Sequence, residues 1–208
     1  MESILKHLHW LGHDCFLYDG GPVIYFDPYE LKRSEPKADI ILITHEHFDH
    51  CSPDDVKKVQ EDDTVIVTDS KSASKLKGNV KVVKPGDSIT VFGVKIEAYP
   101  AYNTNKQFHP QNAGMLSFVV TINDVSVYHA GDTDVIEEME NIHPDIALLP
   151  VSGTYVMTAE EAAEAALKLK PKIAVPMHFG SIVGSDDDAR RFKKLLEGKV
   201  EVRILPKE

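Results

Sequence analysis

Four potential metal ligands, His45, His47, Asp49 and His50, lie within six consecutive residues of the chain. They directly follow the apolar run 40–43, so we expect a buried strand to present them at its carboxyl end. Imidazole suits zinc and similar first-row metals, and a carboxylate suits the same ions or harder ones. Two histidines at i and i+2 can reach one metal from a shared strand edge, and the later Asp–His pair could bind a second metal. The cluster therefore predicts a metal site rather than a chance histidine-rich loop.

Two further ligand candidates follow other predicted strands. Asp132 comes after the apolar run 125–129, and His178 comes after the run 173–176. Ligands in α/β sheets gather at the carboxyl ends of strands, so both side chains are expected to converge with His45. Alone, Asp132 would suggest only a turn that caps the next segment, and His178 only a buried core histidine. Together with the histidine cluster, they predict a composite metal site.

Four polar residues near these segments each allow more than one interpretation. His13 lies between two predicted strands, where it could contact substrate, act as a catalytic acid or occupy an ordinary turn. His109 lies in the polar loop 101–112 and could bind metal, contact substrate or be solvated. Asp27 could orient a ligand imidazole through a hydrogen bond or cap the turn that follows it. His129 could support the site or belong to the core.

The elements that must position these residues come in a clear order, with strands first and β/α alternation afterwards. This order favours an α/β protein with two sheets packed face to face and helices outside. Helix starts are indicated by Ser52 followed by Pro53, and by the capping pair Thr158 and Glu161. We expect helices beginning at 52–55 and covering 72–76, 134–140, 158–169 and 186–196, a hairpin turn at 123–124, and strands at 5–11, 15–18, 23–26, 38–44, 65–67, 80–83, 89–92, 94–99, 115–122, 125–129, 146–149, 173–176 and 200–205.

The spacing HxHxDH of the ligand cluster resembles the signature of the metallo-β-lactamase superfamily. The resemblance implies a four-layer αββα sandwich, in which the first two histidines bind one metal and the Asp and last His bind a second. It continues in the family's order through Asp27, Asp132 and His178, and implies that Asp132 bridges the metals. The opening Trp10-Leu11-Gly12-His13 is similar to the branch containing the ascorbate-6-phosphate lactonases, N-acyl-phosphatidylethanolamine phospholipase D and many uncharacterised metal-dependent hydrolases.

The chain departs from the family pattern after the predicted strand 94–99. Many members carry a ligand histidine here in an HTPGH-like segment, whereas this chain has Tyr-Pro-Ala-Tyr-Asn at 99–103. Either the loop brings His109 to the first metal, or that metal has only His45, His47 and Asp132. The missing segment also weighs against a glyoxalase II or a tRNA 3′-processing enzyme.

Composition limits the remaining possibilities. At 208 residues the chain is expected to form a single domain, 1–208. No apolar run approaches the roughly 20 residues that cross a bilayer, and no secretory signal is evident. Two cysteines are too few for a disulfide framework, which favours the cytoplasm. The net charge of −10 makes nucleic acid an improbable partner, so a small-molecule substrate is expected, and a homo-oligomer is compatible.

These observations predict a metal-dependent hydrolase with one or two divalent ions, zinc or manganese. A metal-bound hydroxide would attack an ester, lactone or phosphodiester bond, with Asp49, Asp132 and His13 as catalytic residues. Lys106 and His109 would suit a small anionic substrate, and the loop residues Tyr102 and Tyr155 would surround it. One alternative is a metal-stabilised binding or regulatory protein without turnover. Another is a di-iron redox protein, whose relatives typically carry Glu where His47 stands and have an attached flavin domain.

Overall fold

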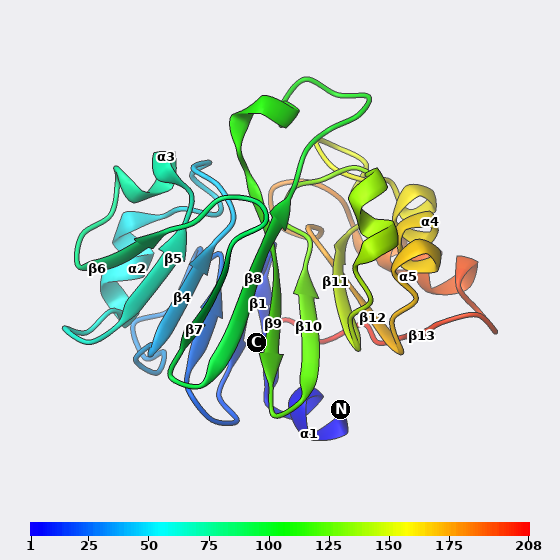
Figure 1. Cartoon of the computed structure of the whole chain (residues 1–208). Coiled ribbons are helices and arrows are strands. Elements are labelled where there is room, and N and C mark those ends of the chain that lie inside the picture. Colours follow the sequence, from blue (N-terminus) through cyan, green and yellow to red (C-terminus); the bar gives the residue numbers. More distant parts are fainter.

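Two β-sheets lie face to face, and helices cover their outer surfaces (Figure 1). The computed structural model describes all 208 residues. The first sheet has the order β1-β2-β3-β4-β5-β6, and the second has the order β13-β12-β11-β10-β9-β8-β7. This arrangement confirms the predicted four-layer αββα sandwich. The strands are β1 (Leu8–Gly12), β2 (Cys15–Tyr18), β3 (Ile24–Phe26), β4 (Ile40–Ile43), β5 (Val65–Thr68), β6 (Asn79–Val82), β7 (Ser88–Val91), β8 (Val94–Pro100), β9 (Leu116–Ile122), β10 (Val125–His129), β11 (Ile146–Pro150), β12 (Ile173–Met177) and β13 (Glu201–Val202).

The helices are short and lie outside the sheets, with α2 and α3 on one side and α4 and α5 on the other (Figure 1). None of them combines the length and apolar character that crossing a membrane requires. The α-helices are α1 (Glu2–Leu5), α2 (Pro53–Val59), α3 (Ser70–Ala73), α4 (Ala159–Leu169) and α5 (Asp186–Leu195), and the 3₁₀ helices are η1 (Gln111–Ala113) and η2 (Glu137–Asn141).

Both sheets contain runs of parallel strands, β3 to β6 in one and β10 to β13 in the other. Parallel strands need cover on both faces, which explains why β4 and β12 are buried throughout. In β4, Ile40 and Leu42 face the core between the sheets, while Ile41 and Ile43 pack on the other side with residues of α2. The carboxyl end of β4 is thereby anchored from two sides, and the histidine cluster follows directly.

The predicted helix starts are confirmed. The Ser52 side chain accepts a hydrogen bond from the Asp55 backbone N–H at the start of α2, where Pro53 occupies the first helical position. At the start of α4, Thr158 and Glu161 form the predicted capping box. Helix caps are local features, so the sequence alone suffices to place them.

Two predicted elements are wrong in type or length. The expected helix 134–140 is only the 3₁₀ helix η2, because Asp134 accepts hydrogen bonds from the distant Thr104 N–H and Lys106 ammonium instead of capping a helix. The expected strand 200–205 stops at β13. Proline at 206 cannot continue a ladder, and the tail instead crosses to β1, where Trp10 pairs with Lys207.

Candidate metal centre

Ten side chains with metal-binding atoms gather where strands of the two sheets end, and eight of them are predicted from the sequence as ligands or catalytic groups. They form overlapping groups whose ligand atoms lie within 4.8 Å of one another. We call His45, His47 and His109 the first ligand group, and His13, Asp49, His50 and His178 the second ligand group. Asp132 lies between the two. The structure thus brings together every residue that the sequence predicts as a ligand or catalytic group: His13, His45, His47, Asp49, His50, His109, Asp132 and His178.

Asp27, at the end of β3, fixes the loop that carries the histidine cluster. Its carboxylate accepts hydrogen bonds from the Thr44 backbone N–H (2.7 Å), the Thr44 hydroxyl (2.7 Å) and His50 Nδ1 (2.8 Å). All three residues are buried. The bond from Nδ1 leaves His50 Nε2 pointing at the ligand groups, which is the orienting role expected of Asp27.

The first ligand group includes His109, so the irregular loop between β8 and β9 folds back onto the histidine cluster. His45 Nε2 and His47 Nδ1 lie 3.0 Å apart, and His109 Nε2 lies 3.3 Å from the same His47 atom. Buried Asn103 holds the loop, because its Oδ1 accepts hydrogen bonds from the His109 backbone N–H and from His109 Nδ1. Of the two arrangements open from the sequence, the geometry favours the one in which His109 replaces the missing family histidine.

The second ligand group is assembled from three loops. His13 Nε2 lies 3.1 Å from Asp49 Oδ2, and the imidazoles of His13 and His178 have centroids 4.1 Å apart. His178 Nδ1 is in hydrogen-bond contact with the Ser152 hydroxyl at 2.9 Å, which turns Nε2 toward Asp132. His13 therefore belongs among the candidate ligands by its position, beside the residues expected there.

Asp132 contacts residues of both ligand groups. Oδ2 lies 3.2 Å from His109 Nε2 and 3.4 Å from His178 Nε2, while Oδ1 lies 3.3 Å from His50 Nε2. The preceding Gly131 has φ +60°, and a Cβ there would lie 2.9 Å from the Leu116 carbonyl oxygen. Glycine is therefore required for the chain to pass so close to the neighbouring strand and deliver Asp132.

Charge in the site is distributed between the carboxylate and two imidazoles. Burial alone would raise the pKa of Asp132, but His50 and His178 outweigh it and hold that pKa well below its usual range. Burial would likewise lower the pKa of His178, yet Asp132 and Asp14 raise it to about 9. His45 differs from His50 and His178, because burial lowers its pKa well below the usual value. The protonated imidazoles of His50 and His178 thus balance the charge of the buried Asp132 carboxylate. A bound cation would supply that positive charge in their place.

The donor set fits a metal. Three buried atoms aimed into the site, His50 Nε2, His178 Nε2 and Asp132 Oδ1, make no hydrogen bond. Unsatisfied polar atoms in a protein interior are costly, so their concentration at one point calls for a partner. Imidazole nitrogens with a carboxylate oxygen form a donor set of the kind that binds zinc and similar ions.

Asp14 is a buried carboxylate that the sequence analysis did not single out. Its oxygens make no hydrogen bond, and it forms a further group with Asp132 and His178. Burial raises the pKa of Asp14 well above the usual value. His129, whose role was open, lies outside the ligand groups and donates from Nε2 to the Asp14 carbonyl at 2.8 Å. The only feature of the sequence that could have pointed to Asp14 is its place directly after His13 in the β1–β2 turn.

Two residues expected to contact substrate lie elsewhere. Lys106 forms ion pairs with Asp134 (2.5 Å) and Glu161 (3.7 Å), and the Tyr102 hydroxyl donates to Glu138. Neither lines the pocket next to the ligand groups. The expectation of an anionic substrate thereby loses its support from Lys106, because the ammonium is already neutralised by carboxylates.

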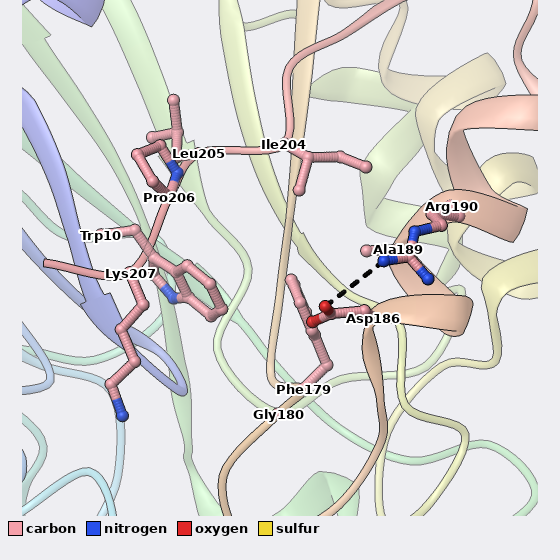
Figure 2. A pocket seen from close by; sticks show the side chains of 10 residues that line it. All are labelled: Trp10, Phe179, Gly180, Asp186, Ala189, Arg190, Ile204, Leu205, Pro206 and Lys207. Atoms are coloured by element: carbon pink, nitrogen blue, oxygen red, sulfur yellow. Dashed lines mark hydrogen bonds and ion pairs between the residues drawn. The ribbon is translucent and has the colours of Figure 1, made fainter.

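A separate cavity of about 470 Å³ is lined by no histidine (Figure 2). Trp10 and Phe179 stack within it at 4.6 Å, and Arg190 pairs with Asp186 on its other side. The Trp10 indole N–H donates to the His13 carbonyl at 2.9 Å. The cavity wall therefore supports the backbone of the second ligand group without itself offering a metal site.

If His109 binds metal, replacing it with alanine should remove metal from the first ligand group and leave the second loaded. The loss of one of three imidazoles should weaken affinity there by more than the roughly 10–100-fold that follows loss of a supporting partner. Elemental analysis after dialysis against a weak chelator measures this. His143→Ala, at an exposed histidine, is the control. Unchanged metal content in His109→Ala would show that His109 is not a ligand.

Comparisons with known proteins place the chain in a family. Residues 7–178 match the model of the beta-lactamase superfamily domain. A relative from Methanoculleus marisnigri named UPF0173 metal-dependent hydrolase is 35% identical over 207 residues, covering 95% of this chain and 91% of the relative. A relative of the same name from Thermococcus onnurineus is 35% identical over 214 residues, covering 95% of both chains.

Solved structures agree with these relatives. A crystal structure from Parabacteroides distasonis has a TM-score of 0.86 and 38% identity, covering 95% of this chain and 91% of that one. A metallo hydrolase from Ignicoccus hospitalis has a TM-score of 0.78 and 25% identity, covering 95% and 94%. The chain therefore belongs to the β-lactamase superfamily, and it is a metal-dependent hydrolase like the relatives it matches.

Proposed function

We propose that the protein hydrolyses an ester, lactone or phosphodiester bond with two divalent metal ions held by the two ligand groups. The position of Asp132 carries this proposal. Its Oδ2 faces both His109 of the first ligand group and His178 of the second, its Oδ1 faces His50 of the second group, and the contacts are 3.2–3.4 Å long. A carboxylate placed in this way suits a bridge between neighbouring cations, which a single-metal or purely structural site would not need.

The ligand set favours zinc or manganese, because imidazoles predominate and carboxylates complete it. When bound, such ions lower the pKa of a coordinated water to about 7 and polarise the bond under attack. His45, His47 and His109 would hold one ion, and Asp49, His50 and His178 the other, with Asp132 shared. The orienting contacts of Asp27, Asn103 and Ser152 set the ring directions before metal arrives.

His13 and Asp49 act as a pair in this proposal. Burial lowers the pKa of His13, which favours the neutral ring over the imidazolium form. Burial would raise the pKa of Asp49, but the hydrogen bond from His13 and the charge of His50 keep it below its usual value. His13 therefore suits a ligand or positioning role that keeps Asp49 ionised, rather than the acid role considered from the sequence.

The test is turnover by protein loaded with zinc or manganese, compared with the same protein after chelation. Aryl esters, lactones and aryl phosphodiesters should be assayed in parallel, with metal content measured on each sample. We expect hydrolysis of at least one class, lost on chelation and restored by metal. Metal-loaded protein that is inert on all three classes would refute the proposal in favour of a binding role.

A further inference from the structure

The pocket next to the ligand groups has an apolar mouth. It encloses about 390 Å³, at the small end of the range for small-molecule sites. Four of its eight lining residues are His47, Asp49, His109 and Asp132, so the pocket opens directly onto the candidate metal centre. The other four are apolar or aromatic: Phe48, Phe108, Tyr155 and Ile182.

These four side chains are unusually exposed for their type. Phe48 is 68% exposed, Phe108 55%, Ile182 40% and Tyr155 37%. Large apolar groups that gather around a concave, polar-floored site typically mark a binding surface. Other exposed large apolar side chains, such as Val82, Phe92 and Leu167, lie outside this pocket, whereas these four share it. Their concentration at one mouth calls for a ligand.

Two of the four apolar residues adjoin ligand candidates in the chain. Phe48 stands between His47 and Asp49, and Phe108 directly precedes His109. The Phe108 and Tyr155 rings pack edge to face with centroids 4.6 Å apart. The mouth is therefore built from the same loops that build the metal centre.

Asn103 joins two of these loops. Its Oδ1 accepts a hydrogen bond from the His109 backbone N–H, and its Nδ2 donates to the Tyr155 carbonyl oxygen at 2.9 Å. Tyr155 is held at φ +69°, a backbone conformation that non-glycine residues rarely adopt. A strained residue held by a buried amide indicates a mouth formed before substrate binds.

No lysine or arginine lines the mouth. The nearby cations are occupied, since Lys106 pairs with Asp134 and Lys71 with Glu46. The whole chain carries a net charge of −10. An anionic substituent would thus find no counter-charge beyond the metals, whereas an uncharged apolar substituent would find four apolar partners.

Resting on the proposed function, we propose that Phe48, Phe108, Tyr155 and Ile182 bind an uncharged acyl or aryl substituent of the substrate. The substituent lies in the mouth while the bond to be hydrolysed lies over Asp132 and the ligand groups. The pocket volume suits a medium-length acyl chain or one aromatic ring. These residues accordingly set specificity and do not take part in bond cleavage.

Binding of alkyl hydroxamic acids tests this without turnover, because the hydroxamate head binds metals and only the tail varies. Calorimetric titration of zinc-loaded protein should show hexanohydroxamic acid binding at least about tenfold more tightly than acetohydroxamic acid, since each fully buried methylene is worth up to about fourfold. Phe48→Ala and Phe108→Ala should each reduce that ratio severalfold while leaving metal content and acetohydroxamate affinity unchanged. Phe92→Ala, with the same 55% exposure as Phe108 but on the β7–β8 turn, is the matched control.

The outcomes separate this inference from the proposed function. Equal affinity for both hydroxamates would overturn the inference even if the protein hydrolyses esters. A steep tail dependence that disappears in the two variants would support it even if no tested bond is cleaved. Sedimentation velocity adds one further check: variants that change only the oligomeric state would overturn the inference and assign the mouth to contact between copies.

Discussion

Replacing Asp132 with alanine is expected to remove metal from both ligand groups and to lower kcat/KM by more than about a hundredfold. Loss of a partner that merely supports a ligand costs roughly 10–100-fold, and Asp132 contacts both groups directly. The substitution also removes the charge that keeps protons on His50 and His178. The imidazoles that remain have no shared anion between the two ligand groups. Rate assays and elemental analysis on the same preparations measure both effects.

Asp132→Asn distinguishes a ligand from a turn residue. Asparagine keeps the size of the side chain and its ability to cap a turn, but it loses the charge that a bridging ligand needs. We expect this variant to be nearly as inactive as the alanine variant, with circular dichroism unchanged. Full activity in Asp132→Asn would contradict the bridging role.

Asp145→Ala serves as the control for removing a strand-flanking carboxylate. Asp145 lies at the opposite end of β11, where it accepts hydrogen bonds from the Ser126 N–H and the Lys172 ammonium. Its removal should lower stability by about 1 kcal/mol for the lost hydrogen bonds and leave metal content unchanged. A comparable loss of activity in this variant would mean that the Asp132 effect reflects general destabilisation.

Local patterns were sufficient to predict the strand ends and the residues that follow them. His45, Asp132 and His178 each follow an apolar run, and parallel strands carry such residues to one edge. The position of His109 could not be derived in this way, because it depends on a hydrogen bond that the His109 backbone N–H donates to Asn103 Oδ1 across an irregular loop. Spacing along the chain carries no information about that contact.

The residues that were not predicted from the sequence owe their roles to contacts between distant parts of the chain. Ser152 orients His178 from the end of another strand, and its hydroxyl looks like any loop serine. Asp14 is fully buried in the β1–β2 turn, and burial of a turn carboxylate is a tertiary property that the sequence does not reveal. The apolar mouth was not predicted, because the exposure of Phe48 and Phe108 is a tertiary property that their positions in the sequence do not reveal.

Metal-free protein should lose about 3 kcal/mol of stability as the pH rises from about 6.5 to about 9. His178 accounts for this estimate, since its pKa of about 9 lies above the ordinary value of 6.5, and one pKa unit is worth about 1.4 kcal/mol. A histidine whose pKa is raised by folding stabilises the folded state fully below its unfolded pKa. That contribution disappears as the pH rises through the folded pKa. His50, whose pKa is also raised, acts in the same direction.

The other histidines of the site do not mask this change. Burial lowers the pKa values of His13, His45 and His109, so their contributions to folding stability vary with pH only below about pH 6.5. Bound metal opposes this loss of stability between about pH 6.5 and about pH 9. Protons compete with the metal for the same nitrogens, and that competition weakens as the pH rises. Metal-loaded protein should therefore keep its stability to pH 9, and the difference between loaded and stripped protein should widen.

Thermal unfolding of chelator-stripped and zinc-loaded protein at pH 6.5 and pH 9 tests this prediction. For a chain of this length, about 3 kcal/mol corresponds to a fall in Tm of roughly 6–12 °C in the stripped protein. His178→Gln should make that fall shallower, because it removes one of the two imidazoles that hold protons beside Asp132. The exposed His143→Gln should leave it unchanged. If stripped wild-type protein is equally stable at both pH values, protons on His50 and His178 do not balance the buried carboxylate, and a metal ion would have no such protons to replace.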